Sequence, residues 1–252
     1  MYVCSKFTDL SKVKPYKNST LGKKEQVAKM FDTISEDYDG LNRVISFGID
    51  VKWRKKVVKL VKSKNPDSVL DIATGTGDLA INIAKNANAS KIIGLDISQG
   101  MLDVGKEKIK QSGLEGKIDM VLGDSENLPF DDNTFDAITV AFGIRNFETL
   151  ENGLKEILRV LKPNGVFVIL ETSIPTNSFF KFGYNLYTKN VLPLIGKVFS
   201  KDRVAYKYLC ESASIFPYGE ALNNILREIG FINVEDFPQT LGVATIYTSS
   251  KK

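Results

Sequence analysis

The sequence predicts one α/β domain built on a mostly parallel sheet. Short apolar runs alternate with stretches of helical periodicity between residues 68 and 170. Strands that alternate with helices are joined by right-handed crossovers and form a parallel sheet covered on both faces. A glycine-rich turn follows the first run, and acidic residues stand at the ends of the first three runs. The chain of 252 residues is long enough for one such domain with a cap.

Two helices are expected before the sheet, in residues 21–64, after a polar and flexible N-terminus of residues 1–20. Their apolar side chains recur at helical spacing. These positions are Val27, Met30, Phe31 and Ile34 in the first helix, and Trp53, Val57, Leu60 and Val61 in the second. The segment Tyr38–Asn42 between them contains Asp, Gly and Asn and is interpreted as a turn.

Five strands and their helices form the predicted core, residues 65–174. The strands are residues 69–73, 92–96, 118–122, 137–142 and 166–170. Residues 79–87 favour a helix, and Ser98 is a suitable N-cap for the helix after the second strand. An amphipathic helix from Leu150 to Leu161 is expected to stop at Pro163-Asn164-Gly165, just before the fifth strand.

Residues 175–218 interrupt this alternation and are interpreted as an inserted helical cap. The last segment, residues 219–252, begins with a helix that Gly230 should close. Residues 232–237 and 243–248 then follow as strands with only a short link between them, which favours an antiparallel pair. Seven strands are expected in total, with an antiparallel strand at the C-terminal end.

Composition argues against several classes of function. The sequence has no His, which excludes His-based triads and argues against a catalytic zinc site. Cys4 and Cys210 show no pairing motif, which indicates a reducing compartment. No apolar run approaches the ~20 residues that span a bilayer, and the start lacks the apolar core of a signal peptide. We expect a cytoplasmic protein whose net charge of +4 leaves peripheral contact with the inner face of the membrane open.

A candidate cofactor site begins at the first strand end, where residues 71–78 read Asp-Ile-Ala-Thr-Gly-Thr-Gly-Asp. Glycines at 75 and 77 allow a sharp turn and the close approach of a ligand. Asp96 lies 19 residues after Gly77, where a carboxylate can accept hydrogen bonds from both ribose hydroxyls. On these residues NAD and S-adenosylmethionine fit equally, because Gly75-x-Gly77-x-x-Ala80 nearly matches the dinucleotide fingerprint.

Two further acids favour S-adenosylmethionine. Asp71 precedes the glycines, where dinucleotide sites usually keep an apolar strand end, and Asp124 follows the third strand with a carboxylate suited to an adenine amino group. The three-acid set resembles the Rossmann-like class I methyltransferases over residues 68–172. The resemblance implies that the glycine turn holds the methionine end, the second acid the ribose and the third acid the adenine. The implied cofactor residues are Asp71, Gly75, Thr76, Gly77, Asp96, Ile97, Asp124 and Ser125.

Longer stretches narrow this resemblance. Residues 31–48 with Trp53 resemble the first signature of the ubiquinone/menaquinone biosynthesis C-methyltransferases, residues 159–173 resemble their second, and residues 142–146 their substrate-site segment. The match covers almost the whole chain after Lys24. The sequence departs from the pattern by having Leu41 for Met, Asp50 for His and Asn164 for Gly. Any role of a His at position 50 therefore cannot operate here.

The resemblance implies S-adenosylmethionine-dependent methylation of a ring carbon in a reduced polyprenyl quinone. The acceptor is demethylmenaquinol, which we favour, or the corresponding ubiquinone precursor. The ring carbon becomes nucleophilic once a neighbouring hydroxyl loses its proton, and the resulting charge must be stabilised. Arg145 is implied for this role, directly or through a water, because a guanidinium does not deprotonate. Asn146 and Tyr38 could position the ring oxygens.

Other functions stay open or are disfavoured. The main alternative is a methyltransferase for a phenol or a sterol-like lipid, and a cofactor-binding subunit without activity is disfavoured by Arg145. No nucleic-acid partner is expected, because the chain lacks a basic stripe with interleaved aromatics. The sequence leaves the oligomeric state open, with a homodimer as one expectation.

The cap is rich in apolar and aromatic residues. These side chains could line a slot for the prenyl tail, contact the membrane, or form the core of the cap itself. They are Phe179, Phe180, Phe182, Tyr184, Tyr187, Leu192, Leu194, Ile195 and Phe199.

Overall fold

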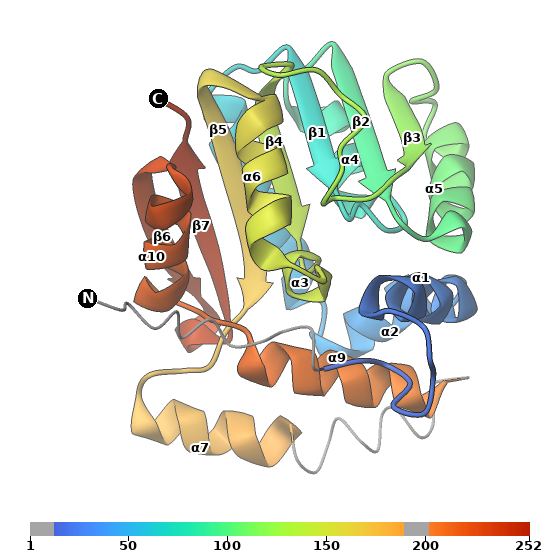
Figure 1. Ribbon diagram of the computed structural model, residues 1–252, viewed down its shortest axis with the longest axis vertical. Coiled ribbons are helices and arrows are strands. Elements are labelled where there is room, and N and C mark those ends of the chain that lie inside the picture. Colours follow the sequence, from blue (N-terminus) through green and yellow to red (C-terminus); the bar gives the residue numbers. More distant parts are fainter. Residues whose placement is uncertain (1–12, 189–201) are drawn as a thin grey trace.

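The computed structural model describes residues 13–188 and 202–252, and its centre is a seven-stranded sheet (Figure 1). The strand order is β3-β2-β1-β4-β5-β7-β6. Strands β1 to β5 run parallel, and β7 is antiparallel to both β5 and β6. The predicted mixed sheet with an antiparallel C-terminal strand is confirmed. The strands are β1 (Ser68–Ile72), β2 (Lys91–Asp96), β3 (Ile118–Leu122), β4 (Phe135–Ala141), β5 (Leu161–Thr172), β6 (Ile232–Gln239) and β7 (Ala244–Ser250).

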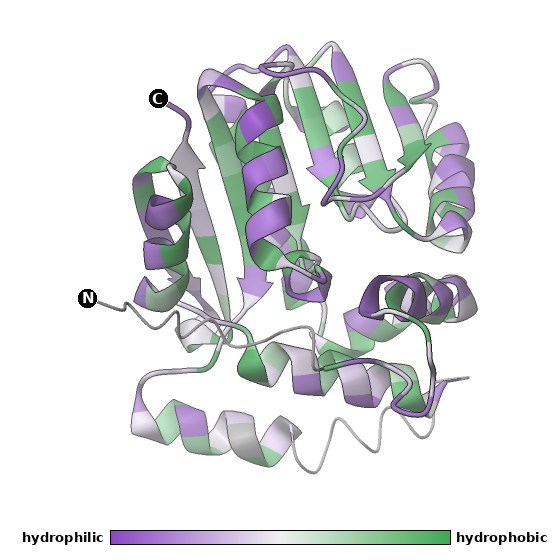
Figure 2. Ribbon diagram, in the orientation of Figure 1, coloured by the Kyte–Doolittle hydropathy of each residue, from purple (hydrophilic) through white to green (hydrophobic). Residues whose placement is uncertain are grey.

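Helices cover both faces of the sheet, because its central strands β1, β4 and β5 are buried on both sides. Figure 2 shows these strands mainly in the colour of hydrophobic residues. Successive strand residues point to opposite faces, so Val69 packs with α3 and α4 while Leu70 packs with α6 and α10. These helices are α3 (Ile49–Ser63), α4 (Asp78–Asn86), α6 (Leu150–Val160) and α10 (Glu220–Ile229). Ser98 caps α5 (Gln99–Gln111) by accepting a hydrogen bond from the Met101 N–H at 3.2 Å, and Gly230 ends α10 with φ 115°, both as expected.

A layer of helices lies beyond the carboxyl ends of the parallel strands (Figure 1). It contains α1 (Lys23–Ile34), α2 (Tyr38–Ile45), α7 (Ser178–Leu186) and α9 (Arg203–Ile215). Buried apolar side chains from α1 and α9 pack together, among them Met30 and Tyr208. Ligands of open α/β sheets bind at this end of the strands, so the layer covers the expected site.

Parts of the predicted cap and N-terminus lie outside the described residues. They are residues 1–12 with Cys4, and the cap residues Leu192, Leu194, Ile195 and Phe199. No helix within residues 13–188 and 202–252 has the length and apolar character needed to cross a bilayer.

The expected turn at Tyr38–Asn42 is wrong, because the segment begins helix α2. Its Asp, Gly and Asn favour a turn in isolation, but Leu41 is buried at 3% exposure. The ring of Tyr38 packs edge-on against that of Phe31, with the ring centres 5.8 Å apart. Tertiary packing therefore outweighs local preference here.

Pro163-Asn164-Gly165 does not stop helix α6, which already ends at Val160. The three residues lie inside β5, where the pairing with β4 shifts register between Leu161 and Val166. Asn164 has φ 62°, a left-handed conformation that Asn tolerates, and its N–H donates to the Lys251 carbonyl at 3.0 Å. The segment is a bulge in the strand.

Candidate active site

The turn after β1 forms a fixed wall at the end of β2. Gly75 and Gly77 have φ of 57° and 78°, conformations that favour glycine because it lacks a Cβ. The Gly75 N–H donates to Oδ2 of Asp96 at 2.8 Å. Gly75, Asp96 and Ile97, three of the predicted cofactor residues, line one pocket.

Asp71, Thr76 and Gly77 lie behind this wall and do not line the pocket. Asp71 is 1% exposed and accepts hydrogen bonds of 2.6 Å from two threonine hydroxyls, one of them Thr74 of the turn. Its burial raises the pKa of this carboxyl to about 6. The Thr76 hydroxyl donates to Asp39 of α2 at 2.7 Å. These three predicted residues therefore stabilise the conformation of the turn and do not face the pocket.

Asp96 presents a buried carboxylate to the pocket. Its Oδ1 accepts the Ser98 N–H at 2.9 Å, and its Oδ2 accepts the Gly75 N–H. Burial raises the pKa of Asp96 to about 6, against the lowering effect of these hydrogen bonds. A carboxylate oxygen can accept more than one hydrogen bond, so both oxygens keep capacity for ligand hydroxyls.

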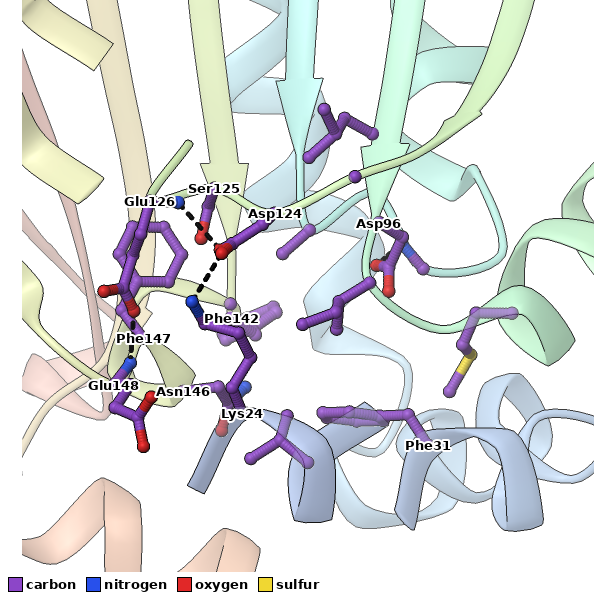
Figure 3. Close-up of a pocket in the computed structure, with 18 of the residues that line it drawn as sticks. Lys24, Phe31, Asp96, Asp124, Ser125, Glu126, Phe142, Asn146, Phe147 and Glu148 are labelled. Carbon is purple, nitrogen blue, oxygen red and sulfur yellow. Dashed lines mark hydrogen bonds and ion pairs between the residues drawn. The ribbon is translucent and has the colours of Figure 1, made fainter. Parts of the chain in front are cut away.

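Asp124 and Ser125 line the same pocket from the segment after β3. Asp124 accepts the Glu126 N–H at 2.9 Å and forms an ion pair with Lys24 of α1. Figure 3 shows Lys24 extending from α1 toward this carboxylate. The pair connects the sheet edge to the covering helix, so a ligand group that used Asp124 would share this carboxylate with Lys24.

Helix α1 is fastened over the pocket at two further points. Asp32 accepts hydrogen bonds from the Ser98 hydroxyl at 2.6 Å and from the Gly100 N–H at 2.9 Å. The Lys23 ammonium donates to the Phe147 carbonyl at 2.7 Å. Helix α1 is therefore part of the wall of the pocket.

A second and larger cavity, of about 970 Å³, lies between the strand ends and the cap. Its lining is mainly apolar and comes from α2, α3, α7, α9 and the turn before β7. The aromatic and aliphatic lining residues include Phe47, Trp53, Phe179, Phe180, Phe182, Tyr184, Tyr187 and Leu241. Its polar lining includes Tyr38, Arg145, Arg54 and Asp50.

Arg145 reaches this cavity from the short 3-10 helix Ile144–Asn146 that follows β4. Its Nη1 donates to Glu171 at 2.6 Å and to the Phe142 carbonyl at 2.8 Å. Arg145 and Glu171 are 6% and 1% exposed. Nε of Arg145 and Oε2 of Glu171 are buried without a hydrogen-bond partner in the described part of the chain. A buried pair with unused polar atoms is a poor stabiliser, which favours a functional reason for it.

The two cavities share a wall formed by Tyr38 and Phe142. The segment after β4 faces both sides, because Asn146 lines the first cavity and Arg145 the second. Phe142 has φ 58°, a conformation that is strained for a residue with a Cβ and that clusters at functional sites. Burial raises the pKa of Tyr38, although the charge of Arg145 acts against the rise, so its hydroxyl stays protonated at neutral pH.

The structure thus divides the predicted catalytic residues between the cavities. Tyr38 and Arg145 line the larger one, whereas Asn146 lies on the other side and accepts a hydrogen bond from the Tyr208 hydroxyl at 3.2 Å. Sequence reasoning missed Lys24, Arg54 and Glu171 as site residues. The sequence did contain a signal for Glu171, because this charged residue directly follows the apolar run of residues 166–170.

The fold is similar to that of solved α/β methyltransferases. A solved S-adenosylmethionine-dependent methyltransferase from Aquifex aeolicus superposes with a TM-score of 0.57 at 18% identity, covering 78% of this chain and 88% of that one. At this identity the likeness concerns the fold alone. The strand order, with an antiparallel strand at the C-terminal end, is that of the class I methyltransferase fold.

The sequence comparisons are more specific. The model of the ubiE/COQ5 methyltransferase family matches residues 19–251. A demethylmenaquinone methyltransferase of Bacteroides fragilis is 47% identical over 241 residues, or 95% of this chain and 98% of that protein. A ubiquinone/menaquinone biosynthesis C-methyltransferase UbiE of Geotalea daltonii is 47% identical over 91% of this chain and 97% of its own length. The chain belongs to the ubiE/COQ5 methyltransferase family, and its cofactor is S-adenosylmethionine.

Proposed function

We propose that this enzyme methylates a ring carbon of demethylmenaquinol, a reduced polyprenyl naphthoquinone. The observation that carries the proposal is the wall shared by the two cavities, with an apolar cavity and a buried arginine on the side away from the cofactor pocket. The name of the relative from Bacteroides fragilis supports the naphthoquinol acceptor, and that of the Geotalea daltonii relative includes both quinone types.

The first cavity has the groups that S-adenosylmethionine requires. We infer that Asp96 accepts hydrogen bonds from the ribose hydroxyls and that Asp124 and Ser125 meet the adenine beside Lys24. Gly75 allows the methionine end to approach the backbone closely, while Asp71, Thr76 and Gly77 hold the turn in shape. Bound there, the cofactor supplies a sulfonium methyl group for in-line displacement.

The residues of the second cavity prepare the ring. Arg145 stabilises the negative charge that develops when the hydroxyl beside the reacting carbon loses its proton. That proton leaves to water, because the guanidinium stays charged and cannot accept it. Tyr38, protonated and in the shared wall, donates to a ring oxygen and orients the ring. After transfer, the ring carbon releases its own hydrogen to water as a proton, which restores the aromatic ring, and the ring oxygen then regains a proton.

The choice of acceptor is tested with reduced naphthoquinol and benzoquinol substrates that carry the same short prenyl chain. We expect kcat/KM to be about ten-fold or more higher for the naphthoquinol, because the extra fused ring buries further apolar area in an apolar cavity. Equal kcat/KM values, or a preference for the benzoquinol, would contradict this assignment while leaving methyl transfer itself intact.

We further propose that the rim of the larger cavity contacts an anionic bilayer, where the prenyl tail resides. Phe47, Phe179 and Phe182 line this cavity and yet are 75%, 79% and 70% exposed. Exposed aromatic side chains suit a membrane interface, and the exposed Lys181 beside them is attracted to anionic headgroups. The Tyr187 hydroxyl donates to the Ile45 carbonyl at 2.7 Å, which fixes this rim to α2.

Replacing Phe179 and Phe182 by serine should weaken binding to vesicles of mixed phosphatidylglycerol and phosphatidylcholine by about ten-fold or more, since each phenylalanine buried in the interface contributes about 1.5–3 kcal/mol. Sedimentation with vesicles at low and high salt measures this binding, which should weaken as salt rises. Ile232→Ser is the matched control, because Ile232 is also exposed but lies at the far end of β6. Unchanged vesicle binding with a lower Tm would show that the two phenylalanines only stabilise the cap.

A further inference from the structure

The larger cavity contains a second arginine whose purpose the methyl-transfer step leaves unexplained. Arg54 of α3 lines the cavity, and its guanidinium carbon lies 5.4 Å from the ring centre of Phe142. It thus approaches the shared wall from α3, whereas Arg145 comes from the segment after β4. Both charges act on Tyr38, because each of them lowers the pKa of its hydroxyl against the effect of burial.

Asp50 holds Arg54 in this position. One turn before Arg54 on α3, it pairs through Oδ2 with Nη1 of Arg54, and its Oδ1 accepts the Ser46 hydroxyl at 2.7 Å. The Asp50 and Arg54 side chains are 5% and 12% exposed. Within the described residues, Arg54 donates no other hydrogen bond to the protein. The remaining N–H groups of its guanidinium can therefore donate to a ligand in the cavity.

The burial of an ion pair on the wall of an apolar cavity is explained if the pair binds a ligand. Burying two charges costs several kcal/mol per ion, about as much as their attraction returns. An apolar pair at positions 50 and 54 would suit a cavity that held only a prenyl tail. The pair instead provides a fixed cationic donor that reaches the cavity from a different element than Arg145 does.

We propose that Arg54, positioned by Asp50, binds the ring oxygen para to the one served by Arg145, so that the enzyme selects a ring with two oxygens. This inference rests on the proposed function, in which the acceptor is a quinol. A quinol has hydroxyls at opposite ring positions, and two arginines reaching one cavity from different elements match that chemistry. A ring that lacks the far oxygen leaves Arg54 desolvated and unsatisfied, so it is rejected.

The test measures binding, so it does not depend on turnover. Trp53 is the single tryptophan of the chain and lines the same cavity, so its fluorescence reports occupancy. The probes are a short-chain reduced naphthoquinol and the same compound with hydrogen in place of the hydroxyl remote from the reacting carbon. The wild-type protein should bind the dihydroxy probe at least ten-fold more tightly.

In Arg54→Met, affinity for the dihydroxy probe should fall at least ten-fold, while affinity for the monohydroxy probe stays within two-fold of wild type. Arg54→Lys, which keeps a charge opposite Asp50, should restore only part of the preference because it lacks the fork. Arg43→Met is the matched control, since Arg43 also approaches Asp50, at 3.9 Å, but does not line the cavity. This control should keep the wild-type preference.

The proposal is overturned if wild type shows no preference between the probes, or if Arg54→Met weakens both probes equally. Failure of the proposed function is a separate result: the wild-type protein would bind the dihydroxy probe with the expected preference and yet transfer no methyl group to it.

Discussion

Replacing Arg145 by alanine is expected to lower the turnover of methyl transfer by about 100-fold or more, because removing one preorganised donor from a developing charge typically has an effect of that size. Arg145 is fixed by Glu171 and by the Phe142 carbonyl, so its position needs little rearrangement during the reaction. Steady-state kinetics at saturating cofactor measure the loss. Cofactor affinity should stay within a few-fold, since Arg145 does not line the cofactor pocket.

Arg145→Lys should recover little of this activity, because an ammonium cannot meet Glu171 and the ring oxygen with a planar fork. Glu171→Gln tests the buried partner: it keeps the shape of the side chain but leaves Arg145 without a countercharge. We expect the acid limb of the pH profile of kcat/KM to move to lower pH, because an uncompensated cation favours the ionised hydroxyl. Near-normal turnover in both Arg145 variants would assign Arg145 a structural role only.

The second large effect is expected for Asp96→Ala, which should weaken S-adenosylmethionine binding at least ten-fold with the fold retained. Two hydrogen bonds to a carboxylate would be lost, and each is worth about 1.5–3 kcal/mol. Calorimetric titration measures the affinity. Asp103→Ala provides the control, because Asp103 is an exposed carboxylate on the neighbouring helix α5. Unchanged affinity in Asp96→Ala would show that the ribose does not bind this carboxylate.

Protonation of the same group makes binding depend on pH. The pKa of Asp96 is about 6 without cofactor, so the carboxylate that accepts the ribose hydroxyls is lost as pH falls below that value. Affinity should be constant above about pH 7 and should fall about ten-fold for each further pH unit below 6. The effect is not unfolding: a carboxyl pKa raised by folding stabilises the folded state when it is protonated. A flat affinity between pH 5 and 7 would contradict the assignment.

Much of the fold follows from patterns that are local in the chain. The alternation of apolar runs and helices determines the parallel core, and the short link before β7 determines its antiparallel strand. The acids Asp96 and Asp124 come together because carboxyl ends of parallel strands share one edge of the sheet. These features require no knowledge of distant contacts.

Other features depend on contacts between distant segments and could not be predicted. Helix α2 forms although its Asp, Gly and Asn residues favour a turn, because Leu41 is buried by the rest of the molecule. Lys24 meets Asp124 across 100 residues, and Arg145 meets Glu171 across 26. The position of Asn146 on the cofactor side, one residue from Arg145, likewise depends on how the 3-10 helix packs. Asp50 and Arg54 have the i,i+4 spacing of a helical pair, but their place on a cavity wall depends on the packing of distant segments.

The most direct test of the account is the product formed from S-adenosylmethionine with a deuterated methyl group and reduced demethylmenaquinone. We expect one labelled methyl group on the ring carbon next to the prenyl-bearing carbon, identified by mass and by the loss of that ring proton from the NMR spectrum. The oxidised quinone should give no product, since it has no hydroxyl to ionise. A labelled methyl group on oxygen, or equal labelling of the oxidised quinone, would contradict the account.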